Sequence, residues 1–152
     1  MRQRWTEVAV LAVVLFAING LARLIVWQAE IANDEDQILA GLLASIAAAL
    51  VCVAAGIRWS HRYPMSRVVL DVGAAVLVAA LLAVLVGPYL GGSTPLVEGF
   101  GFALRQFVYY AGLMAFGAAV GVLLTITVGK DWKTRGWKNH EESIRSRPKR
   151  VR

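Results

Sequence analysis

Four ionisable side chains fall within or beside long apolar stretches of this 152-residue chain: Glu7, Arg23, Asp71 and Arg105. A charge at the centre of a bilayer costs about 2.5–3.5 kcal/mol on insertion scales, so a charge kept in an apolar helix usually pairs with another group, binds a ligand or relays a proton. The depth of each group therefore decides which chemistry it can perform.

Asp71 is the most informative of the four. It follows Arg67 by four residues, a spacing that predicts an ion pair along the first turns of a helix. It also heads the face that carries Ala75 and Ala79, so we expect it to point between helices. The alternative is a buried acid that docks a neighbouring subunit or relays a proton from the cytoplasm. Glu7, by contrast, sits at a helix start, where solvated interfacial carboxylates are favoured.

The other two charges lie near the opposite ends of their segments. We expect Arg23 to extend to the outer headgroups and to pair with Glu30 or with the acidic residues 34–36. Asn19 lies one helical turn earlier on the same face, and this polar patch could meet another helix or a lipid headgroup. Arg105 is expected to anchor the outer mouth of the last helix, with binding of an anionic lipid headgroup as the alternative.

The elements that carry these residues are predicted to be membrane-spanning helices. Hydrophobic residues make up 58% of the chain and charged residues only 17%. A bilayer core about 30 Å thick needs roughly 20 apolar residues in a helix, and four segments meet this requirement: residues 8–27, 38–57, 68–87 and 107–128. The predicted fold class is an all-α polytopic membrane protein. Extending the last helix back to Phe100 would bring Arg105 below the lipid surface, so residues 95–106 are expected to lie at the outer interface.

The loops predict the orientation, because Lys and Arg are retained on the cytoplasmic side. Of the sixteen basic residues, fourteen precede the first segment, separate the second from the third, or follow the fourth. The two other connecting stretches, residues 28–37 and 88–99, have none. We therefore expect both ends in the cytoplasm, with a transmembrane domain over residues 1–129 and a basic cytoplasmic tail over residues 130–152.

Small residues recur every four positions in three of the segments, a pattern that lets helices approach closely in lipid. Together these runs predict a compact bundle. They comprise Ala40, Ala44, Ala48, Cys52 and Gly56; Ala75, Ala79, Ala83 and Gly87; and Gly117, Gly121, Thr125 and Gly129.

The tail combines nine basic residues with Trp132 and Trp137. A juxtamembrane basic segment is attracted to anionic lipid by about 1 kcal/mol per residue near the surface, and the two Trp side chains could anchor it there. The simplest interpretation is a positive-inside signal with a disordered end, and a docking site for a cytoplasmic or membrane partner is the alternative. Nucleic-acid binding is not expected.

Residues for catalysis or cofactor binding are sparse. His61 and His140 lie outside the apolar segments, so neither is placed to ligate a haem in the bundle. Cys52 is the single cysteine and can form no internal disulfide. The middle third of each segment holds no acid, base or histidine, whereas ion conduction and proton-coupled transport normally need one. No enzyme activity, metal or cofactor is expected.

The four-helix plan is similar to that of small multidrug exporters and of small flippase-like proteins that act on polyprenyl sugars. The exporters carry a glutamate well inside the first helix, whereas Glu7 lies at its start. The sequence favours a non-catalytic accessory or assembly subunit of a larger membrane complex, respiratory or envelope-building. The alternative is a small homo-oligomeric transporter or lipid flippase. The composition, rich in Arg, Ala, Val and Gly, points to the cytoplasmic (inner) membrane of a high-GC bacterium.

Overall fold

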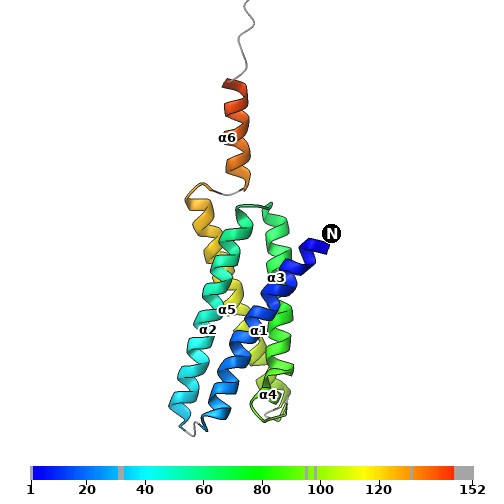
Figure 1. The fold of residues 1–152 in the computed structure, drawn as a ribbon, viewed down its shortest axis with the longest axis vertical. Helices are drawn as coiled ribbons and strands as arrows, with labels where there is room; N and C mark the ends of the chain where they lie inside the picture. Colours follow the sequence, from blue (N-terminus) through cyan, green and yellow to red (C-terminus); the bar gives the residue numbers. More distant parts are fainter. Residues whose placement is uncertain (1, 31–32, 95, 98, 131, 146–152) are drawn as a thin grey trace, which may run out of the picture.

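A computed structural model describes residues 2–30, 33–94, 96–97, 99–130 and 132–145, and its secondary structure over these residues is entirely helical. The helices are α1 (Arg2–Gln28), α2 (Asp34–Ser60), α3 (Met65–Leu85), α4 (Gly87–Leu90), α5 (Phe100–Thr127) and α6 (Trp132–Arg145). The four long helices run up and down along one axis, and α6 continues beyond the bundle (Figure 1).

Each long helix has two main neighbours. α1 packs on α2 and α3, and α5 packs on the same two helices, so α1 and α5 lie diagonally opposite each other. The short α4 folds back against α1 and α3. We call the end with the α2–α3 turn the inner end and the end with the α1–α2 turn and α4 the outer end, after the predicted topology.

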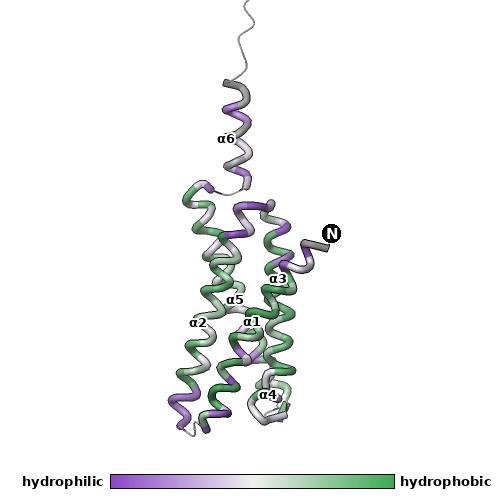
Figure 2. Tube along the Cα trace, in the orientation of Figure 1, coloured by the Kyte–Doolittle hydropathy of each residue, from purple (hydrophilic) through white to green (hydrophobic). Residues whose placement is uncertain are grey.

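Within the described residues, four helices are long and apolar enough to cross a membrane, which confirms the predicted all-α fold with four candidate spans. Large apolar side chains such as Leu50, Leu70 and Phe116 point away from the bundle, as expected of a surface in contact with lipid. Hydrophobic residues occupy the long middle stretches of the helices, and hydrophilic residues gather at the two ends and along α6 (Figure 2).

The helices extend beyond the apolar segments that predicted them. α2 begins at Asp34, where the Asn33 side chain caps the helix by accepting a hydrogen bond from the Glu35 backbone N–H. The acidic residues 34–36 therefore form the exposed first turn of α2, where carboxylates complement the positive end of the helix dipole.

One predicted boundary is wrong. We expected the last helix to begin near residue 107 and residues 95–106 to form a separate interfacial segment, but α5 is a single helix from Phe100. Arg105 does not interrupt it, because its side chain is exposed on the outside of the helix rather than buried in the bundle. The third apolar segment also differs, since α3 ends at Leu85 and Pro88 starts the separate turn of α4.

The predicted small-residue runs lie in the helix interfaces. Ala75, Ala79 and Ala83 on α3 and Gly87 at the start of α4 are buried, as are Gly117, Gly121 and Thr125 on α5. A Cβ atom added at Gly117 would lie 2.5 Å from the carbonyl oxygen of Ala49, and one at Gly121 would collide with that of Val53. The backbones of α2 and α5 therefore touch directly, which is the close approach that the GxxxG spacing predicts.

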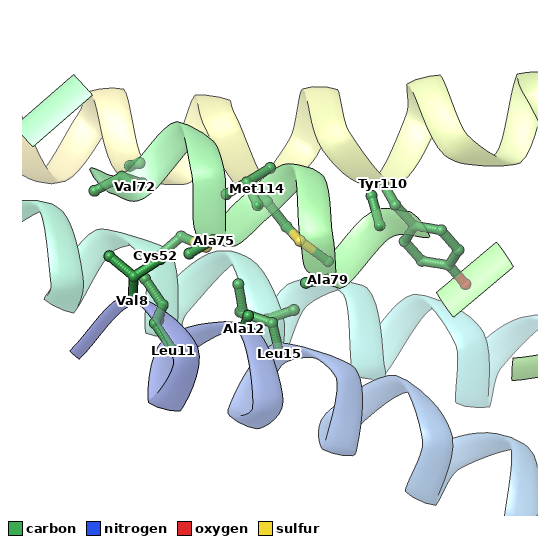
Figure 3. Packing of buried hydrophobic residues seen from close by; sticks show 14 of the residues in the cluster. Val8, Leu11, Ala12, Leu15, Cys52, Val72, Ala75, Ala79, Tyr110 and Met114 are labelled. Atoms are coloured by element: carbon green, nitrogen blue, oxygen red, sulfur yellow. The ribbon is translucent and has the colours of Figure 1, made fainter. Parts of the chain in front are cut away.

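Apolar side chains fill the middle of the bundle between its two polar ends. Leu15 from α1, Cys52 from α2, Ala79 from α3 and Met114 from α5 are almost completely buried and point toward one another (Figure 3). Tyr110 closes this core on the outer side and lines the cavity described below.

The tail contains an element that was not predicted, the helix α6. Its base is linked to the bundle by His61, whose Nδ1–H donates a hydrogen bond to the carbonyl oxygen of Lys130 at 2.6 Å. Trp132 and Trp137 are both more than half exposed on α6.

Candidate functional site

At the inner end, two arginines converge on the buried carboxylate of Asp71. The Nε–H and Nη2–H groups of Arg4 donate to Oδ1 at 2.8 and 2.5 Å, and the Nε–H of Arg67 donates to Oδ2 at 3.3 Å. The Asp71 side chain is only 9% exposed. Both carboxylate oxygens are thus used, which is the arrangement a buried charge requires.

The helix geometry explains this cluster. Arg67 belongs to the same helix as Asp71, one turn earlier, and its guanidinium lies 3.8 Å from the ring centre of Tyr63 in a cation–π contact. Arg4 comes from α1, so its ion pair holds α1 against α3. The i,i+4 pair with Arg67 is confirmed, whereas the larger contribution of Arg4 was missed. The sequence held one signal for it: both residues lie near the N-termini of helices that were predicted to start at the same membrane surface.

At the outer end, α1, α2, α5 and the segment after α4 surround a cavity of about 1040 Å³. It forms where α1 and α5 do not pack on each other. Polar and aromatic side chains line it, among them Asn19, Arg23, Trp27, Gln37, Gln106 and Tyr110. We refer to it as the outer cavity.

Arg23 is the cationic residue among those that line the outer cavity. Its Nε–H donates to Oδ1 of Asn19 at 3.2 Å, and Asn19 is only 5% exposed. Gly87 makes room for the arginine, because a Cβ atom there would lie 3.1 Å from Nε. The predicted ion pair with Glu30 or residues 34–36 is wrong for the described part of the chain, where the two salt bridges found both involve Asp71.

The segment after α4, which forms part of the cavity wall, also packs closely against α1 at Gly92. Gly92 has a φ of +72°, and a Cβ atom there would lie 2.9 Å from Nε1 of Trp27. A left-handed backbone without a side chain is what glycine supplies at low cost. The connection from α3 to α5 therefore packs closely on the outer end of α1 and holds Trp27 beside Arg23.

The remaining candidates lie elsewhere. Arg105 is exposed and is not part of the cavity lining, although its neighbour Gln106 is. Trp132 and Trp137 lie on α6, where they border a shallow groove with Lys133, Gly136 and His140. The structure thus brings Asn19 and Arg23 together and keeps both apart from Asp71, Arg105 and the tail.

The described residues contain no group of three or more His, Cys, Asp or Glu side chains arranged to hold a metal ion. No family model, curated protein or solved structure matches the chain. Over the residues that the structure describes, the fold is all-helical, with four helices long and apolar enough to span a bilayer. These helices are hydrophobic along their middle stretches and hydrophilic toward both ends (Figure 2).

Proposed function

We propose that this protein is a non-catalytic accessory or assembly subunit of a larger membrane complex. The observation that supports it best is the cluster at the inner end, in which Asp71 is shared by Arg4 and Arg67. A carboxylate fixed by three hydrogen bonds is suited to holding helices in place.

The packing of the bundle supports the same role. Gly117 and Gly121 bring α5 against the backbone of α2, and the apolar core around Leu15 and Met114 fills the space between the two polar ends. A bundle closed in this way offers its outer faces, its tail and its outer cavity to other molecules. We expect the larger subunits to contact those faces, with the tail also meeting anionic lipid headgroups.

The subunit role is tested by extracting the tagged full-length chain from its native membrane with a mild detergent and identifying the proteins that co-purify. The proposal expects larger, unlike membrane chains in a fixed ratio to the tagged chain. The substitution Gly121→Leu, at a helix-packing position, should abolish co-purification of these chains. Gly112→Leu, at an exposed position of the same helix, should leave co-purification unchanged. Recovery of self-copies only would count against it.

A small transporter or lipid flippase remains the second proposal, and the outer cavity is the observation that favours it. A polar pocket with an arginine, open at one end of a bundle, could be one state of a carrier. In that case Asp71→Asn would abolish transport in reconstituted vesicles. The subunit role expects the vesicles to show no transport with either the native chain or the variant.

A further inference from the structure

The outer cavity carries an inference of its own, which does not depend on the subunit role. We propose that it is a binding site for one glycerophospholipid, whose phosphate is held by Arg23 and whose acyl chains leave along the lipid-facing side of the bundle.

Arg23 supplies the recognition group. A guanidinium has five N–H donors in a planar fork that matches the oxygens of a phosphate. The Asn19 side chain accepts a hydrogen bond from the Nε–H of Arg23, which orients the guanidinium. Gly87 packs against the same guanidinium, at a point where any side chain would displace the arginine. Within the described residues no acid lies close enough to form a salt bridge with Arg23, so its two terminal nitrogens are available to an anion.

The rest of the lining suits a phospholipid headgroup rather than a bare ion. Gln106 presents a side-chain amide and Glu30 a carboxylate at the same cavity, and these can accept hydrogen bonds from headgroup hydroxyl or ammonium groups. A volume of about 1040 Å³ is far larger than a phosphate ion requires. It is of the size that encloses a large organic ligand.

The rim of the outer cavity connects it to the surrounding lipid. Ile38 and Phe102 both line the cavity and are 71% and 48% exposed, so they belong at once to the cavity wall and to the outer surface of the bundle. A ligand with a polar head and apolar chains can therefore rest its head beside Arg23 and its chains against these side chains. Trp27, also exposed at the rim, is of the residue type that prefers the headgroup layer.

Native mass spectrometry of the full-length chain, delipidated in detergent and then titrated with phosphatidylglycerol, tests the proposal. We expect one tightly bound lipid on the native chain. The substitution R23Q should weaken this binding by about tenfold or more, the usual effect of losing a charge-assisted hydrogen bond. R105Q is the matched control, since Arg105 lies on α5 at the same end of the bundle but outside the cavity, and it should bind as the native chain does.

A second variant keeps the test valid if R23Q folds poorly. A Cβ atom added at Gly41 meets no other atom within 4 Å, and Gly41 lines the outer cavity, so G41L should fill part of the cavity without a clash. It should lower phosphatidylglycerol binding while G112L, also free of close neighbours but outside the cavity, leaves it unchanged.

Two further ligands test which part of the phospholipid the outer cavity recognises. Phosphate-free diacylglycerol should bind weakly, and inorganic phosphate alone should not compete at millimolar concentration. Equal retention of diacylglycerol, or unchanged binding in both R23Q and G41L, would overturn the proposal. Effective competition by inorganic phosphate would overturn the lipid as the ligand and assign the cavity to a soluble anion.

Discussion

Arg4 and Asp71 are 67 positions apart in the sequence, and their side chains form an ion pair with two hydrogen bonds that joins α1 to α3. Asp71 is buried while Arg4 is 38% exposed. Breaking the pair therefore costs more free energy at the carboxylate than at the arginine, because a buried charge without partners bears its full desolvation cost.

We predict that Arg4→Ala destabilises the bundle by about 1–3 kcal/mol, the usual cost of removing a partner from a buried polar group. The free energy of unfolding can be measured by titration with a denaturing detergent in mixed micelles. Arg62→Ala is the control, since Arg62 is an exposed arginine at the same end of the bundle. A loss of equal size in both variants would show that the effect is one of net charge alone.

A double-mutant cycle with Arg4→Gln and Asp71→Asn isolates the pair itself. We expect the two losses to be non-additive by about 0.5–3 kcal/mol, as for residues in one hydrogen-bond network. The unfolding titration gives all four values. Additive losses would mean that the two side chains stabilise the fold independently of each other.

The contact between α2 and α5 makes a second prediction. Gly121→Ala should destabilise the protein by about 1–3 kcal/mol, because the added methyl group meets the carbonyl of Val53 and overpacks the interface. Gly112→Ala on the same helix has no close neighbour and should be neutral or stabilising by up to about 1 kcal/mol. If the two variants unfold alike, the direct backbone contact is not formed.

The tail makes a third prediction, which concerns the lipid surface. With the full-length protein in nanodiscs, trypsin should cleave the tail more slowly in anionic than in zwitterionic lipid, because basic residues are drawn to an anionic surface. Joint replacement of Trp132 and Trp137 by Ala should reduce the difference, since both aromatic rings are exposed and able to insert. Cleavage at the same rate in the two lipids would contradict binding of the tail to the anionic surface.

Much of the fold could be predicted because its signals are local. Hydropathy gives the four spanning helices, and the four-residue spacing of Gly117 and Gly121 predicts the tight interface with α2. The ion pair of Arg67 with Asp71 follows from helical periodicity alone. The predicted start of α5 near residue 107 is wrong because a charge on the exposed face of a helix, such as Arg105, does not end the helix.

Other parts of the site depend on how the helices are arranged, which the sequence pattern does not specify. Arg4 meets Asp71 because α1 crosses α3 at that point. Gln37, Gln106 and Tyr110 share a cavity with Arg23 because α1 and α5 lie across the bundle from each other. The polar residues at the outer ends of the second and fourth segments were the available signal for that cavity.

The proposed topology places the Asp71 cluster at the cytoplasmic surface and the outer cavity on the opposite side of the membrane. Labelling of single cysteines in intact cells with a membrane-impermeant maleimide tests it directly, in a Cys52→Ala background. Ser93 lines the cavity and Glu142 is exposed on α6, so each can be replaced by cysteine. We predict that S93C is labelled in intact cells and E142C only after the membrane is disrupted. Labelling of E142C in intact cells, with S93C protected, would contradict the account.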